Sequence, residues 1–284
     1  MKKENMILWG MVLLFAVMMS VPFLVPHTGL LALFGFLPLL AMERIATLLE
    51  KKRVWIYHYS AFVLWNALTT FWVCNATVGG GIFAILANSL QMSLVFGLFR
   101  WSKKRFTGAL PYIFLMVTWI AWERFYFDAE ISWPWLVLGN SFARTIWAVQ
   151  WYEITGTLGG SLWVWACNLG LFGLMISLSD GSWWNYNIKA KSAAVTGYLA
   201  ILILPFIVSG QIGKKYEDAM TAPEMLQTVI IQPNIDPYNK FQALTQDQQN
   251  AIFLNQAAEE LSHRKNETTA SPLLLLAPET FTGD

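Results

Sequence analysis

The sequence predicts a multi-pass α-helical membrane bundle of about seven transmembrane helices, followed by the start of an α/β domain. Hydrophobic residues make up 56% of the 284-residue chain and charged residues only 13%, about half the charged share of a typical soluble domain. Apolar runs of the roughly 20 residues that a helix needs to span a bilayer recur through the first three quarters of the chain. The remainder is more polar and its pattern indicates strand, helix and strand.

Candidate spans are the apolar runs at residues 6–24, 29–49, 54–74, 78–99, 109–127, 160–178 and 193–210. The second run is the weakest because Glu43 and Arg44 interrupt it. The first run continues past Met19 without a small-x-small cleavage site, so we expect a retained helix rather than a signal peptide.

Basic residues predict the orientation of these spans. Lys and Arg concentrate around Arg53, around Lys103 and at Lys189 and Lys191, whereas the connection 22–28 has none. The positive-inside rule then places these basic loops and the N-terminus in the cytoplasm. An odd number of spans delivers residue 211 onward to the opposite side.

The connection at about 128–159 is expected on that outer side, and it is rich in aromatic residues such as Trp133, Trp135 and Trp147. Two interpretations remain open. The aromatic side chains could form a belt at the lipid–water boundary, or the segment could fold back onto the membrane.

We therefore divide the chain into a transmembrane domain at 1–212, a polar linker at 213–224 and the beginning of an α/β domain at 225–284. Leu226–Gln232 is predicted to be a strand that Pro233 ends. Thr245 and Gln248 fit a capping box at the start of a helix. Leu273–Ala277 is predicted to be a fully buried strand, which completes one parallel crossover unit.

Glu279 follows that last strand directly, after Pro278. Ligands of open α/β sheets bind at the carboxyl ends of strands, and a partly buried carboxylate there suits the work of a general base. A solvated loop residue is the alternative interpretation.

Composition excludes several classes of function. The net charge of +1 gives no basic field for nucleic acid. Cys74 and Cys167 lack metal-ligand spacing, as do the three histidines, so we predict no metal site. Both cysteines are interpreted as small packing residues.

Several motifs occur in a recognisable order. They are Trp122-Glu123-Arg124, Trp133-Pro134-Trp135-Leu136, Leu138-Gly139-Asn140-Ser141, Ile231-Gln232-Pro233-Asn234-Ile235 and Pro278-Glu279, with Gln150, Gly156, Gly159 and Asn168 between them. In this order the whole chain resembles bacterial apolipoprotein N-acyltransferases, which are inner-membrane enzymes with a periplasmic nitrilase-type domain.

The resemblance implies acyl transfer from a phospholipid to the N-terminal diacylglyceryl-cysteine of an apolipoprotein, in lipoprotein maturation. The family uses a Glu-Lys-Cys triad and a thioester intermediate, and it needs no cofactor. Only the glutamate maps onto this chain, as Glu279. The family's lysine follows that glutamate, so Lys240 does not match it. We therefore expect a fragment, a truncated frame or one piece of a split protein, inactive alone.

The resemblance also makes Arg124, Trp133, Trp135 and Asn234 candidate substrate-binding residues in a monomeric protein of the bacterial inner membrane, whose C-terminal domain is periplasmic. Simpler interpretations stay open. Arg124 could neutralise its neighbour Glu123, and Asn234 could be a turn residue. Asn140, Gln150 and Asn168 are expected to satisfy one another within the bundle.

Two other functional classes remain as alternatives. One is a different membrane-bound amidase of the nitrilase superfamily, although a single helix would suffice to tether it. The other is a non-catalytic membrane protein.

Overall fold

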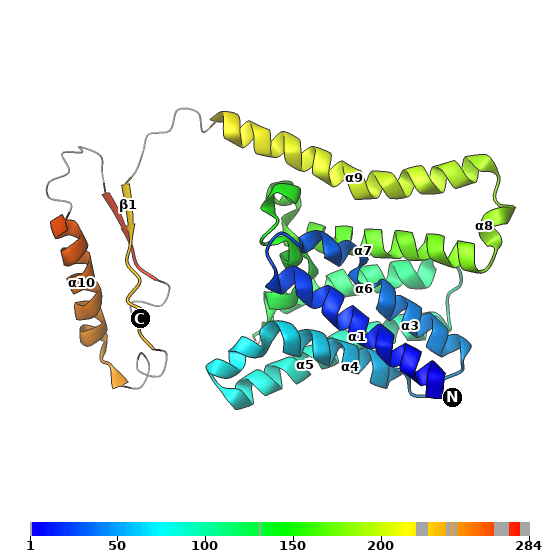
Figure 1. Cartoon of the computed structure of the whole chain (residues 1–284), viewed down its shortest axis with the longest axis horizontal. Coiled ribbons are helices and arrows are strands. Elements are labelled where there is room, and N and C mark those ends of the chain that lie inside the picture. Colours follow the sequence, from blue (N-terminus) through cyan, green and yellow to red (C-terminus); the bar gives the residue numbers. More distant parts are fainter. Residues whose placement is uncertain are drawn as a thin grey trace. The chain divides into compact units, whose positions relative to one another are not determined.

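Long helices form almost all of the first of two units into which the chain divides, Met1–Glu217 and Asp218–Asp284 (Figure 1). The computed structural model describes residues 2–130, 132–219, 227–236, 240, 243–263 and 273–278. Each unit is described by itself.

The first unit contains both α-helices and short 3₁₀ helices. The α-helices are α1 (Lys2–Leu24), α2 (Ala32–Gly35), α3 (Leu37–Leu48), α4 (Val54–Thr70), α5 (Val78–Ser102), α6 (Leu110–Phe127), α7 (Tyr152–Ser179), α8 (Ser182–Asn185) and α9 (Ile188–Ala219). The 3₁₀ helices are η1 (Gly29–Leu31), η2 (Phe71–Asn75), η3 (Pro134–Leu136), η4 (Leu138–Phe142) and η5 (Ile146–Ala148).

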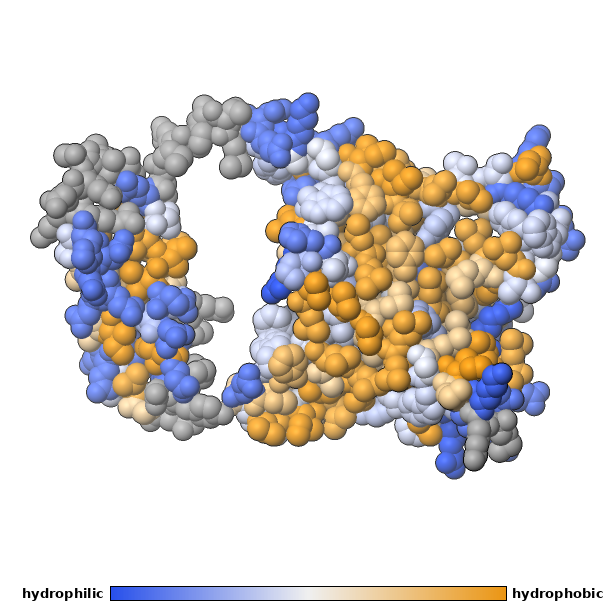
Figure 2. Space-filling view, in the orientation of Figure 1, coloured by the Kyte–Doolittle hydropathy of each residue, from blue (hydrophilic) through white to orange (hydrophobic). Residues whose placement is uncertain are grey.

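Five helical segments of the described residues are long and apolar enough to cross a membrane: α1, Gly29–Leu48, α5, α7 and α9. Helix α4 has 17 residues, and α6 carries Glu123 and Arg124 near its end. Apolar side chains cover most of the visible face of this unit, and hydrophilic ones gather near the N-terminus (Figure 2). This distribution is the one expected when lipid rather than water surrounds the helices.

The segment expected as one span at 29–49 is a broken helix. Helices α2 and α3 meet at Phe36, whose backbone N–H donates to Oδ1 of Asn168 in α7 at 2.8 Å. The amide nitrogen of Asn168 donates to the carbonyl of Ala32 at 2.9 Å. A side chain from another helix therefore satisfies the backbone groups that the break leaves open, as membrane interiors require.

Glu43, whose charge made this segment the weakest predicted span, is buried in the bundle. Its carboxylate accepts a hydrogen bond from Nζ of Lys103 at 2.6 Å and lies 3.5 Å from Nε of Arg100. The charge is thus paired with two cations from the end of α5, which is the usual arrangement for ionisable residues in membrane bundles.

Helices α7 and α9 both extend beyond the predicted spans. Helix α7 begins at Tyr152 rather than near 160, and it contains a non-helical residue, Gly156, with φ of 64°. A positive φ is accessible to glycine at little steric cost. Helix α9 continues to Ala219, so residues 213–219 of the expected linker are helical. Lys214, Lys215 and Glu217 within them are good helix formers.

Aromatic rings build the centre of the bundle. The ring of Phe36 lies 4.4 Å from that of Trp165 and 5.5 Å from that of Trp119, between ring centres. The ring of Phe15 packs edge-on against that of Phe36 at 5.2 Å. Such tilted and edge-to-face pairs are favoured over a face-to-face sandwich, and they bring α1, α6 and α7 together around the helix break.

The second unit contains β1 (Gln227–Ile230), α10 (Gln246–His263) and β2 (Leu273–Leu276). The strands pair in parallel, with Gln227 opposite Leu273, as the sequence predicts. The capping box is also present. The backbone N–H of Thr245 donates to Oε1 of Gln248, and that of Gln248 donates to Oγ1 of Thr245.

The prediction that the last strand is fully buried is wrong for its described residues. The leucines of β2 are 37–42% exposed. The small hydrophobic core of this unit is formed by Val229 in β1, Ile231 directly after β1, and Phe253 and Ala257 of α10. Helix α10 therefore packs over β1, and β2 lies beside that contact.

Candidate functional site

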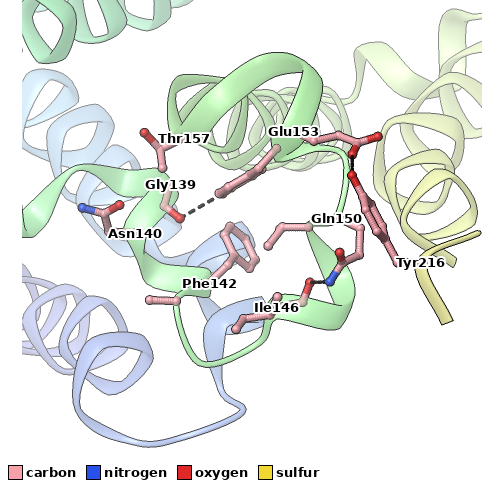
Figure 3. Close-up of a pocket in the computed structure, with 11 residues that line it drawn as sticks. Gly139, Asn140, Phe142, Ile146, Gln150, Glu153, Thr157 and Tyr216 are labelled. Atoms are coloured by element: carbon pink, nitrogen blue, oxygen red, sulfur yellow. Dashed lines mark hydrogen bonds between the residues drawn. The ribbon is translucent and has the colours of Figure 1, made fainter. Parts of the chain in front are cut away.

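A cavity of about 440 Å³ lies between the connection from α6 to α7, the beginning of α7 and the C-terminal end of α9 (Figure 3). Its walls come from η4, η5, the first turns of α7 and one residue near the end of α9. The lining residues are Gly139, Asn140, Phe142, Ala143, Ile146, Val149, Gln150, Tyr152, Glu153, Thr157 and Tyr216.

Glu123 fixes the start of this wall. The carboxylate is buried, and its Oε1 accepts hydrogen bonds from the backbone N–H of Leu138 at 2.9 Å and from Nε1 of Trp119 at 3.0 Å. The next backbone N–H, that of Gly139, donates to Oγ of Ser161 at 3.1 Å. Helices α6 and α7 thus hold the wall from both sides.

Tyr152 and Gly139 lie close together inside the wall. The hydroxyl of Tyr152 donates to the carbonyl of Gly139 at 2.9 Å. A Cβ atom on Gly139 would overlap the backbone carbonyl of Thr157. Glycine is therefore the residue that allows the connection to approach α7 this closely.

Helix α9 completes the cavity. Tyr216 donates its hydroxyl hydrogen to Oε2 of Glu153 at 2.5 Å. Figure 3 marks this hydrogen bond with a dashed line. The backbone N–H of Gln150 donates to Oγ of Ser209 at 2.9 Å. These two contacts, which join α9 to the connection and the start of α7, bring residues about 60 positions apart in the chain to one site.

The lining is amphipathic. Phe142, Ile146 and Val149 give an apolar side, whereas Asn140, Glu153 and the Tyr216 hydroxyl are polar. A pocket of this size with few polar groups is typical of small-molecule sites. The arrangement suits a molecule with an apolar chain and a polar head.

The connection at 128–159 folds back onto the bundle. Leu136, Leu138 and Phe142 join the main hydrophobic core, and the backbone N–H of Gly29 donates to Oγ1 of Thr145. Trp147 nevertheless remains 58% exposed. The segment therefore packs on the helices and still presents an aromatic ring outward, while its position relative to the lipid–water boundary stays a prediction.

The predicted binding residues in the first unit lie outside the cavity lining. Arg124 is exposed and forms an ion pair with Asp128 rather than with Glu123. The ring of Trp135 is 55% exposed and packs edge-on against Trp72, with ring centres 5.2 Å apart. Trp133 is partly buried beside Trp135.

The other predicted site residues belong to the second unit. Asn234 is exposed and has φ of 52°, a left-handed conformation that asparagine tolerates well in turns. This geometry supports the interpretation as a turn residue. Glu279 lies outside the described residues.

Asn140, Gln150 and Asn168 do not satisfy one another as expected. The side-chain nitrogen of Asn140 donates to the carbonyl of Pro134, and that of Gln150 donates to the carbonyl of Ile146. Asn168 bonds the backbone at the helix break. Each of these side chains therefore bonds backbone groups instead, nearby in sequence for Asn140 and Gln150 and in another helix for Asn168.

Sequence reasoning missed Glu153 and Tyr216. They are 63 residues apart, and no periodicity connects them. Gly139, Asn140 and Gln150 did carry a signal, since they stand in the recognised motifs. Among the described residues no group of three or more His, Cys, Asp or Glu side chains is placed to hold a metal ion. The thiol of Cys167 is buried and that of Cys74 is partly buried, and both are free.

The helical bundle, with five candidate membrane-crossing helices among the described residues, is that of a multi-pass membrane protein with an amphipathic cavity at one end. The chain belongs to the apolipoprotein N-acyltransferase family: the family described as "Apolipoprotein N-acyltransferase N-terminal domain" matches residues 15–170.

A curated relative supports the same assignment. The chain is 28% identical over 222 residues to an apolipoprotein N-acyltransferase of Chlorobaculum tepidum. The match covers 77% of this chain and 39% of the relative, so the chain spans well under half of that protein. No solved structure matches.

The close approach at Gly139 leads to a prediction. Gly139→Ala is expected to destabilise the bundle by about 1–3 kcal/mol, because the added methyl group forces the connection away from the Thr157 carbonyl. Thermal unfolding of the purified protein in detergent measures this. Gly97→Ala is the matched control, because a Cβ there meets open space. Equal stability of the two variants would contradict the predicted overlap.

Proposed function

We propose that this chain supplies the membrane domain and the beginning of the nitrilase-like domain of an apolipoprotein N-acyltransferase. The enzyme would move an acyl chain from a phospholipid to the N-terminal diacylglyceryl-cysteine of a lipoprotein. The observation that carries the proposal is the family match over residues 15–170, because it includes the wall of the cavity from Gly139 to Thr157.

The cavity would receive part of an acylated substrate. Its apolar side, with Phe142 and Ile146, suits an acyl chain, and Asn140 and Glu153 suit a polar head or an amine. Tyr216 lies two residues before Asp218, where the second unit begins. That second unit contains Glu279, the proposed general base.

Acyl transfer by the protein expressed from its complete gene tests the proposal. The protein is incubated with a phospholipid labelled in its acyl chain and with a diacylated lipopeptide. We expect a labelled triacylated product. A folded, membrane-inserted protein that yields none would contradict the proposed activity, and release of free labelled fatty acid instead would favour the amidase or hydrolase alternative.

The proposal includes seven spans in the bacterial inner membrane, with α4 and α6 added to the five candidate segments. The basic residues near 53, 103 and 189 would then face the cytoplasm and residue 211 onward the periplasm. Reporter fusions at residues 103 and 215 are expected to report opposite sides, and a fusion at residue 52 should agree with that at 103. The same side for 103 and 215 would contradict this topology.

A further inference from the structure

Helix α9 contains a proline inside the segment that is long and apolar enough to cross a membrane. Pro205 has no backbone N–H, so it cannot donate to the carbonyl of Ile201 four residues earlier, and its ring clashes with that carbonyl in a straight helix. Figure 1 shows that α9 changes direction partway along its length, which is the usual effect of a proline within a helix. The proline therefore leaves one backbone acceptor of α9 open at the bend.

The side chain of Trp163 in α7 supplies the donor that the proline removes. Its Nε1 donates to the carbonyl of Ile201 at 2.9 Å, and the residue is buried in the bundle. An open carbonyl is costly in hydrocarbon, and neighbouring helices satisfy such groups where a proline interrupts a spanning helix. In an unbroken α-helix the amide of residue 205 would already donate to this carbonyl. The bond from Trp163 therefore depends on the bend and fixes it against α7.

The residues after the bend, 206–217, form an arm of α9 that reaches the cavity. Phe206 begins this arm, and its ring lies edge-on to that of Trp163, with ring centres 5.2 Å apart. One turn later, Ser209 accepts a hydrogen bond from the connection between α6 and α7. Tyr216, near the end of the arm, lines the cavity itself. The arm thus forms one wall of the cavity and begins at a residue in contact with Trp163.

The arm is otherwise loosely packed. Only 6% of the most apolar stretch of α9 is buried inside the bundle, and Ile207, Val208 and Gly210, on both sides of the buried Ser209, are exposed. Segments with few buried apolar contacts open at a low free energy, and a few residues at a bend can absorb such a movement. The direction of the arm therefore depends more on the bend than on packing along its length.

We propose that Trp163 is a positioning residue for the cavity, and that the arm of α9 is a lid whose hinge is the bend at Pro205. The bond to Ile201 and the ring contact with Phe206 hold the hinge in the closed geometry, in which Tyr216 lines the cavity. Without that bond the hinge is released and the arm moves away from the cavity. The inference stands on contacts within the bundle, and only its consequence for acyl transfer rests on the proposed function.

Disulfide formation across the closed lid tests the hinge. The 284-residue chain is used in membrane vesicles, after its two natural cysteines, Cys74 and Cys167, are replaced by alanine. Gln150→Cys and Ser209→Cys form the test pair, because the 2.9 Å contact between the Gln150 nitrogen and the Ser209 oxygen brings their Cα atoms within reach of a disulfide. Trp163→Phe keeps the ring but loses the N–H, and it should slow cross-linking by an oxidant by about three- to tenfold, the value of one hydrogen bond.

Two further variants isolate the hinge. Trp122→Phe removes an indole hydrogen bond to Gln91 in α5 and should leave the cross-linking rate unchanged. In Pro205→Ala the new amide can donate to the carbonyl of Ile201, so adding Trp163→Phe should cause no further slowing. Equal rates for Trp163→Phe and its parent, equal slowing by Trp122→Phe, or further slowing in the Pro205→Ala background would each overturn the proposal.

The effect on the reaction is measured in the protein expressed from its complete gene. Trp163→Phe should raise KM for the diacylated lipopeptide by about three- to tenfold and leave kcat nearly unchanged, because the lid shapes the cavity rather than the reacting groups. A lower kcat with unchanged KM would contradict a role of the lid in substrate binding. Absence of acyl transfer in the wild type would contradict the proposed function alone, because cross-linking is measured without the reaction.

Discussion

Glu123→Leu is expected to destabilise the bundle by about 2–6 kcal/mol. The substitution removes the acceptor for two buried donors, the backbone N–H of Leu138 and Nε1 of Trp119, and each unsatisfied buried donor costs about 1–3 kcal/mol. Thermal or denaturant unfolding in detergent measures the loss. Because Leu138 begins η4, the cavity should also lose its fixed wall.

Two variants isolate the cause of this loss. Glu123→Gln keeps an oxygen that can accept the same hydrogen bonds, so most of the stability should return. Glu130→Leu makes the same replacement at an exposed carboxylate and should change stability by less than about 0.5 kcal/mol. A loss after Glu123→Leu no larger than that after Glu130→Leu would show that the carboxylate does not hold the connection.

Glu279→Gln in the protein expressed from its complete gene is expected to lower acyl transfer by about 10²–10⁴-fold, the usual effect of losing a general base. The amide cannot accept the proton of the attacking thiol, so formation of the thioester should slow as well. Accumulation of acyl-enzyme with a labelled phospholipid follows this step directly.

The comparison is with Glu259→Gln, an exposed carboxylate of α10, which should keep the wild-type rate. If Glu279 were only a solvated loop residue, its substitution would change the rate by less than about threefold, as exposed charges contribute little. Thioester formation at the wild-type rate in Glu279→Gln would place the base elsewhere.

Hydrophobic patterning predicted where helices lie but not how they are interrupted. The apolar runs correspond to α1, α4, α5, α6, α7 and α9, because length and apolarity are local properties. The break at Phe36 depends on Asn168 in another helix, and the pairing of Glu43 depends on Lys103. Such long-range partners leave no period in the sequence.

The sequence marked some residues of the cavity without predicting a site there. Gly139, Asn140 and Gln150 stood in recognised motifs and line the cavity. Arg124, a cation at the end of a helix, was predicted to bind substrate, but it forms an ion pair with Asp128 one turn later. Glu153 could not be recognised as a site residue from the sequence, because its hydrogen-bond partner Tyr216 is 63 residues away and is brought to it by the fold of α9.

The helix break also determines the order in which parts of the protein can fold during synthesis. Phe36 and Asn168 are 132 positions apart, and a ribosome adds about 5–20 residues each second, so about 7–26 s separate the synthesis of the two partners. Throughout that interval the nascent segment around α2 and α3 has an open amide that the hydrocarbon core does not tolerate. The packing of this segment into the bundle is therefore a late step of biogenesis. Newly made chains with a substitution at Asn168 would be exposed to membrane proteases before the bundle is complete.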